Sequence, residues 1–121
     1  MSDSSLIGTA ALARLERFLD VSVFRHSLIS SNMANIDTPG YRTRDVNFAA
    51  EMRRATDGLI YASYTPAARP VEGLLERPDG NNVSLERESL LLARTQLGFN
   101  AAVQLMRAEF RRLSLAINEG K

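Results

Sequence analysis

His26 is the residue best suited to acid–base or metal chemistry, because it is the only histidine and the chain contains no cysteine. A metal site around it would have to take its other ligands from carboxylates. The nearest acid in this stretch, Asp20, lies six positions away and on another face of a helix. We therefore expect His26 to be buried or to set the register of helix packing, with no metal site and no cofactor.

Glu86 and Glu88 are the other side chains that could do acid–base work. They are two residues apart, so they would lie on different faces of a helix. Capping and the helix dipole explain acids at a helix N-terminus without any catalytic role. The sequence has neither a glycine-rich phosphate loop nor a nucleophile elbow. We expect no catalytic residue, and the sequence argues against an enzyme.

Two further patterns have simpler explanations than chemistry. Asn82-Val83-Ser84 matches a glycosylation sequon, but a turn followed by a helix N-cap accounts for the same residues, and no secretory signal accompanies it. Arg107, Arg111 and Arg112 could touch phosphate. No aromatic residues are interleaved with them on that face, so a solvated or partner-facing helix end is the better interpretation.

Charge and hydropathy exclude two classes of partner. The chain has 15 basic and 14 acidic residues, a net charge of +1, which offers no attraction to nucleic acid or to an anionic membrane. The longest apolar run, Leu90–Ala93, is far shorter than the roughly 20 residues that span a bilayer. We expect no nucleic acid and no direct membrane insertion. A chain of 121 residues forms a single domain, 1–121.

Apolar residues near the N-terminus recur at alternating spacings of three and four, which is a heptad pattern. Ser22 and His26 interrupt it. The pattern predicts a helix over residues 9–36, after a frayed start at residues 1–8, where Gly8 disfavours helix. A second apolar stripe on a neighbouring face is Val21, Phe24 and Leu28. The apolar positions of the main seam are Leu12, Leu15, Leu19, Ile29, Met33 and Ile36.

The C-terminal part has the same spacing and predicts a helix over residues 84–118, with Ser84 as its N-cap. Gln96 is the one polar break in its seam. A second stripe lies on another face of this helix, at Ala101, Leu105, Ala108 and Leu115, and is broken by Arg112. The apolar positions of the main seam are Leu92, Phe99, Val103, Met106, Phe110, Leu113 and Ile117.

The middle, residues 37–83, is rich in turn residues and is expected to be irregular. Asp45 could cap a short helix from Phe48 to Ala55. Leu59–Tyr61 and Gly73–Glu76 could each be extended and could pair as a short β hairpin. The expected fold is all-α dominated, with the two long helices paired as an antiparallel, coiled-coil-like hairpin.

A dense run of turn residues follows the first helix. Asn35 and Asp37 bond nearby backbone and tolerate left-handed conformations. Thr38 precedes Pro39 and is therefore pushed toward extended dihedrals, and Gly40 permits a positive φ. This run predicts a helix end followed by a turn of fixed geometry. We call it the signature turn, made of Asn32, Asn35, Asp37, Thr38, Pro39, Gly40 and Tyr41.

The stretch Ser31-Asn32-Met33-Ala34-Asn35-Ile36-Asp37-Thr38-Pro39-Gly40-Tyr41 resembles the N-terminal signature of the flagellar rod and hook proteins. Asp45-Val46-Asn47-Phe48 and the block Asn82–Glu88 narrow the resemblance to the proximal rod proteins of the basal body. It covers about residues 10–48 and 80–118. Ser89 and Phe99 depart from the pattern, since a larger apolar residue and Tyr are commoner there, and leave the packing at those positions less defined.

The resemblance implies a structural subunit of a helical tube that transmits torque for motility. The paired termini would form the inner wall, and the middle would pack between neighbours. The residues of the two main seams would form the assembly interface, through coiled-coil contacts between subunits, and the signature turn would fix the angle at which the chain leaves the first helix. Implied partners are copies of the same chain, other rod proteins, and the ring and export-gate junction proteins. The location would be the basal body, reached through the flagellar export apparatus without a cleaved signal peptide. Arg42, Arg44 and Asp45 would be candidates for polar contacts between subunits.

The residues themselves also favour assembly. Each predicted helix carries a second apolar stripe that one partner helix cannot cover, so we expect the end helices to be poorly ordered alone and to fold on assembly. A head-to-tail contact that does not close would generate a filament. Two alternatives remain open. A soluble helical adaptor or export chaperone would be a folded monomer or small closed oligomer, and other axial proteins are mostly longer, with a larger central domain.

Overall fold

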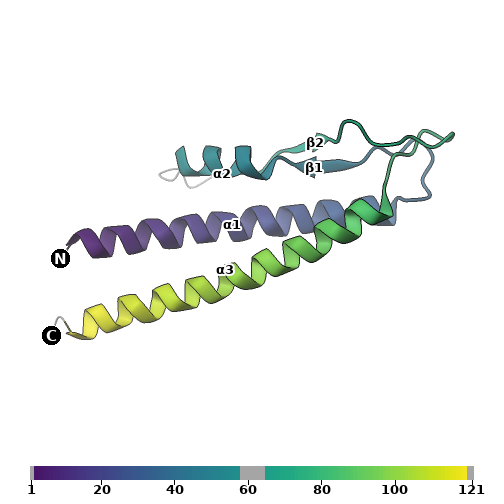
Figure 1. Ribbon diagram of the computed structural model, residues 1–121. Coiled ribbons are helices and arrows are strands. Elements are labelled where there is room, and N and C mark those ends of the chain that lie inside the picture. The colour runs from purple at the N-terminus through teal and green to yellow at the C-terminus, as the bar shows by residue number, and fades with distance from the viewer. Residues whose placement is uncertain (1, 58–64, 120–121) are drawn as a thin grey trace.

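Two long helices frame the molecule. The computed structural model describes residues 2–57 and 65–119. The elements are α1 (Ser2–Ala34), β1 (Arg44–Val46), α2 (Phe48–Asp57), β2 (Ala68–Pro70) and α3 (Leu85–Glu119). In Figure 1, α1 and α3 lie side by side and run in opposite directions, so both chain ends are at the same end of the hairpin. The predicted helix-dominated antiparallel hairpin is confirmed.

Helix α1 begins at Ser2, so the prediction of a frayed start over residues 1–8 is wrong for residues 2–8. Packing explains this. A Cβ atom on Gly8 would lie 2.5 Å from Nη2 of Arg112 and 3.0 Å from Cδ2 of Leu113. The missing side chain lets α3 approach closely, which outweighs the low intrinsic helix propensity of glycine. The other ends of α1 and α3, at Ala34, Leu85 and Glu119, agree with the predictions within the usual margin of one or two residues.

The α1–α3 contact buries few side chains completely. Val21, Ile29 and Ala102 are buried apolar residues of the two helices. Of the predicted seam, Phe110 and Ile117 are 56% and 67% exposed. The remaining seam positions are half-buried: Leu12, Leu15, Leu19, Met33, Ile36, Leu92, Phe99, Val103, Met106 and Leu113. The predicted seam is therefore at least partly covered within the chain along most of its length and becomes uncovered towards the end of α3.

The middle of the chain forms a small second layer. β1 pairs antiparallel with β2, with Arg44 opposite Pro70 and Val46 opposite Ala68. The predicted strand at Gly73–Glu76 is wrong, and its proposed partner, Leu59–Tyr61, lies outside the described residues. Burial determines which segment forms a strand: Val46 in β1 is 4% exposed, whereas Leu75 in the predicted strand is 90% exposed. A short strand forms where its apolar side chain can be covered.

Helix α2 lies along α1, as Figure 1 shows. Asn47 caps it, since its Oδ1 accepts a hydrogen bond of 3.1 Å from the Ala50 amide. The prediction that Asp45 is this cap is wrong, because the Asp45 carboxylate is bound instead to Arg25 and Arg87. The rings of Phe48 and Phe18 meet edge to face with centroids 5.0 Å apart, which anchors α2 on α1.

Candidate functional site

Buried polar side chains concentrate where α1 ends and α3 begins. We call this region the head and define it as residues 31–46 and 77–88. Within the part of the chain that the structure describes, every buried side-chain nitrogen and oxygen has a hydrogen-bond partner. The buried polar residues of the head are Asn32, Thr43, Asp45, Asn81, Asn82 and Glu88. A fully satisfied polar cluster of this kind specifies one geometry, because any displaced partner would leave a buried group unpaired.

Asn32 is the centre of this cluster. Its amide nitrogen donates to the Arg44 carbonyl at 2.8 Å and to Oε1 of Glu88. Its oxygen accepts from the Tyr41 hydroxyl at 2.9 Å and from the Arg44 amide at 3.2 Å. One carboxamide thus joins α1, the signature turn, β1 and α3. Glu88 is fully buried, so the explanation of this residue by capping alone is wrong: its second oxygen accepts from Arg87 at 2.8 Å.

The signature turn has the fixed geometry that the sequence predicted. The Thr38 hydroxyl donates to Oδ1 of Asn35 at 3.0 Å, and Gly40 has a φ of +76°. The Gly40 amide donates to the Asp79 carbonyl at 2.9 Å. Gly80 also has a positive φ, and a Cβ there would lie 3.4 Å from the Gly40 Cα atom. Two turns distant in sequence therefore pack backbone against backbone.

The last carbonyl groups around the end of α1 are satisfied from across the molecule. The Asn81 side chain donates to the carbonyls of Asn35 at 2.9 Å and Thr38 at 2.8 Å. Arg77 donates to the Ile36 carbonyl. Asn81 Oδ1 accepts from the Val83 amide at 2.8 Å. Helix ends need such partners for their unpaired carbonyls. The sequence pattern indicated only that residues 37–83 are rich in turn residues, and this capping role of Asn81 was missed.

Asn82 also belongs to the head and is 2% exposed. Its Oδ1 accepts from the Thr43 amide at 2.6 Å, and its carbonyl accepts from the Thr43 hydroxyl at 3.2 Å. Because the Asn82 side chain is buried and hydrogen-bonded, it cannot be reached for glycosylation. Its contacts with Thr43 explain why an asparagine stands at this position of the sequon. Ser84 is the N-cap of α3 as predicted, with its Oγ accepting from the Arg87 amide at 3.2 Å.

Asp45 forms the charged part of the head. Both of its oxygens accept from Arg25, at 3.0 and 2.9 Å, and one also accepts from Arg87 at 2.7 Å. Burial raises the pKa of Asp45, but the hydrogen bonds from Arg25, the Val46 amide and Arg87 together lower it further, so the pKa lies below the ordinary value of 3.8. The carboxylate joins α1 to α3 within one chain.

Several predicted site residues lie at the surface of the head. Arg42 is exposed, and it pairs with Glu76 at 3.2 Å and donates to the Gly80 carbonyl at 3.2 Å. Arg44 is exposed as well, beside its buried neighbour Asp45. In the signature turn, Asp37 and Pro39 are exposed. These side chains surround a rigid core and are the ones that another molecule could reach.

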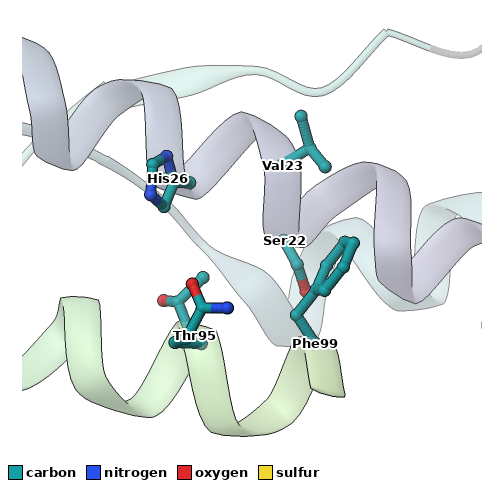
Figure 2. Close-up of a pocket in the computed structure, with 6 residues that line it drawn as sticks. Ser22, Val23, His26, Thr95 and Phe99 are labelled. Carbon is teal, nitrogen blue, oxygen red and sulfur yellow. The ribbon is translucent and has the colours of Figure 1, made fainter. Parts of the chain in front are cut away.

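The polar breaks of the two seams meet in one hollow between α1 and α3. Ser22, His26 and Gln96 line it together with Val23, Thr95 and Phe99, and its volume is about 180 Å³. Figure 2 shows Ser22 and Phe99 pointing toward each other from the two helices. His26 is exposed at this hollow rather than buried, because smaller or polar neighbours leave the seam open there. Within the described residues, no cluster of three or more His, Cys, Asp or Glu side chains could hold a metal ion.

Exposed apolar side chains recur along the outer face of α3, with the polar residues Gln104 and Arg111 among them. Leu97, Leu105 and Leu115 are 71%, 58% and 61% exposed. With 3.6 residues per turn, they share one face with other exposed positions. We call this set the outer stripe: Leu90, Leu97, Ala101, Leu105, Ala108 and Leu115. The second stripe of α1 differs, since Val21 is buried and Phe24 and Leu28 are half-buried. Helix α1 packs against α2 and β1 as well as α3.

The fold and the site together define a class of protein. It is a helical hairpin closed at one end by a satisfied polar head, with one helix face left apolar and uncovered. None of the helices in the described part of the chain has the length and hydropathy to cross a membrane.

Sequence comparison identifies the family within this class. The chain is 34% identical over 106 residues to the flagellar basal body rod protein FlgB of Cereibacter sphaeroides, covering 77% of this chain and 82% of the relative. It is 28% identical to FlgB of Salmonella typhimurium, with 92% and 95% covered, and 26% identical to FlgB of Bacillus subtilis, with 93% and 97% covered. No family model matches. The chain belongs to the FlgB family of flagellar basal body rod proteins, which confirms the resemblance.

Proposed function

We propose that this chain is a structural subunit of the proximal rod, which assembles with copies of itself and with other rod proteins into a helical tube. The outer stripe carries this proposal. Its leucines are more than half exposed, and apolar side chains exposed repeatedly along one helix indicate a surface that another molecule covers. The family relationship supports the same role, because the relatives are named as rod proteins.

The head and the helices would have different tasks in the tube. The predicted seam residues that remain exposed, Phe110 and Ile117, would join the outer stripe in contacts between subunits. The signature turn would fix the angle at which the chain leaves α1. Arg42 and Arg44 would make polar contacts with neighbours, whereas Asp45, whose partners lie in its own chain, would hold the surface that presents them.

The proposal extends to location and mechanical role. The subunit would leave the cell through the flagellar export apparatus without a cleaved signal and join the rod next to the ring and export-gate junction. Helices packed side by side around a tube resist twisting through many apolar contacts at once. In this way the tube would transmit torque, and helix ordering would be completed as each subunit is added.

Circular dichroism and sedimentation of the purified chain, alone and mixed with candidate rod proteins, test the proposal. We expect helical content and sedimentation rate to rise together when rod partners are added. A matched variant, Leu97→Ser with Leu105→Ser, should abolish the rise while Arg53→Ser on α2 leaves it unchanged. A fully helical monomer that is indifferent to every rod partner would contradict the proposal and favour an adaptor or chaperone.

A further inference from the structure

One exposed apolar side chain stands apart from the two helices. Leu75 is 90% exposed, more than any other large apolar side chain among the described residues. It lies in the segment 72–76, which we call the tip. Glu72 and Glu76 flank it, and both are exposed. In Figure 1 the chain between β2 and α3 extends past the end of α1. The tip therefore presents one exposed leucine between two carboxylates, of which Glu76 pairs with Arg42 of the same chain at 3.2 Å.

A hollow of complementary character lies where α1, α2 and α3 meet. We call it the three-helix hollow. Its volume is about 300 Å³, and it is lined by Phe18, Ser22, Arg25, Phe48, Arg94, Thr95 and Gly98. The two phenylalanine rings in edge-to-face contact provide an apolar lining. Gly98 keeps it open, because a Cβ there would lie 3.3 Å from the Phe18 ring.

Charge distinguishes this hollow from the one at His26. Arg94 is exposed at the three-helix hollow, and Arg25 lines it while bound to Asp45. The hollow at His26 is smaller, about 180 Å³, and no arginine lines it. An apolar side chain flanked by carboxylates matches an apolar lining with a cation beside it. Of these two hollows between α1 and α3, the three-helix hollow is the better fit for the tip.

The occupant must come from another molecule. The tip follows β2 and directly precedes residues 77–88 of the head, whereas the hollow is lined by residues of α1, α3 and the start of α2. A tip cannot reach the hollow of its own chain without dismantling the head. A second copy offers the same tip with the required charge.

We propose that the tip of one copy inserts Leu75 into the three-helix hollow of a neighbouring copy, with Glu72 beside Arg94. This rests on the proposed function as a rod subunit. Each copy offers one tip and one hollow, and these are different surfaces. Such a heterologous contact propagates from copy to copy instead of closing in a pair.

Cysteine cross-linking tests the contact, because the chain has no cysteine of its own. Cells that lack the native chain would express Leu75→Cys together with Arg94→Cys on separate copies, and basal bodies would be oxidised and analysed by mass spectrometry. A disulfide forms only when the two Cα atoms come within roughly 7 Å. As a control, Leu75→Cys would be paired with Gln96→Cys, since Gln96 lies at the hollow beside His26. We expect the amount of the 75–94 disulfide to exceed that of the 75–96 disulfide by about tenfold or more.

Charge reversal provides the second measurement. Arg94→Glu should weaken swimming, and adding Glu72→Arg should restore it, whereas the exposed Arg53→Glu on α2 should have no effect. Basal bodies that contain the chain but show no 75–94 link, or that link to position 96 instead, would overturn the tip contact and leave the proposed function standing. Absence of the chain from basal bodies would overturn both.

Discussion

The head and the outer face of α3 have opposite compositions. In the head, buried positions are mainly polar, and the Asn32 carboxamide alone takes part in four hydrogen bonds. On α3 the outer stripe is apolar, and Leu97 is 71% exposed. The head has its partners within one chain, whereas the stripe has none among the described residues of the same molecule. This contrast suggests that the head gives each subunit its shape and the stripe gives it neighbours.

The strongest test of the contrast removes the charge at the centre of the head. Asp45→Ala leaves Arg25 without its counter-ion and leaves Arg87 paired with Glu88 alone, and we expect the head to lose about 3–5 kcal/mol of stability. Amide hydrogen exchange at Thr43, whose amide donates to Asn82, would report the loss. Asp45→Asn is the size-matched control and should lose less. Unchanged exchange in Asp45→Ala would mean that the ion pairs do not hold the head.

A backbone change should have the next largest effect. Gly40 has a φ of +76°, and no atom lies within 4 Å of the place that a Cβ would take, so Gly40→Val acts through strain alone, costing about 1–3 kcal/mol. We expect the chain to be made and exported but swimming to be blocked, because the turn no longer directs the chain correctly. Gly40→Ala should be intermediate in a soft-agar swimming assay. Normal swimming of the valine variant would show that the signature turn does not determine the direction of the chain.

Acid should lower the stability of the head. The pKa of Asp45 in the folded protein lies below 3.8, so the carboxylate contributes stability that is fully present above 3.8 and is lost as pH falls through the folded-state pKa. Urea midpoints measured from about pH 6 to about pH 2 should decline in the acid range. In the Asp45→Asn variant, the urea midpoint should decline less over the acid range. An identical decline in both proteins would assign the acid sensitivity to other carboxylates.

The smallest effect on stability is expected at the outer stripe. Leu97→Ser and Leu105→Ser remove exposed side chains and should change the free energy of unfolding by no more than about 0.5 kcal/mol. They should nevertheless prevent incorporation into basal bodies, measured by immunoblotting of the isolated structures. Ala102→Leu, at a buried position of the same helix, is the opposing control, since it should destabilise the hairpin itself. Normal incorporation of the serine variants would show that the stripe is not an interface.

The sequence predicted the long-range shape better than the site. The alternating spacing of three and four from Leu12 to Ile36 is a local signal, and the same kind of signal located both helices. The start of α1 was missed because the reason for it, the contact of Gly8 with Arg112 and Leu113, lies at the far end of the chain. The strand expected at Gly73–Glu76 was misplaced because such short segments carry too little pattern to locate.

The head could not be predicted for a related reason. Asn32 and Glu88 are 56 positions apart, and each has an adequate local explanation, as a turn residue and as a helix-capping acid. Asn81 likewise caps carbonyls 43 and 46 positions earlier. Only the fold brings these groups together. The signature turn was predicted because the conformation of Gly40 is dictated by neighbouring residues.

Hydrogen exchange of the free chain and of the chain in rod assemblies tests the central contrast most directly. We expect the head amides of Thr43 and Val83 to be protected in both states, because their acceptors are Asn82 and Asn81 of the same chain. The amides of α3 from 97 to 115 should gain strong protection only in the assembly. Full protection of α3 in the free chain, with no change on assembly, would contradict the account.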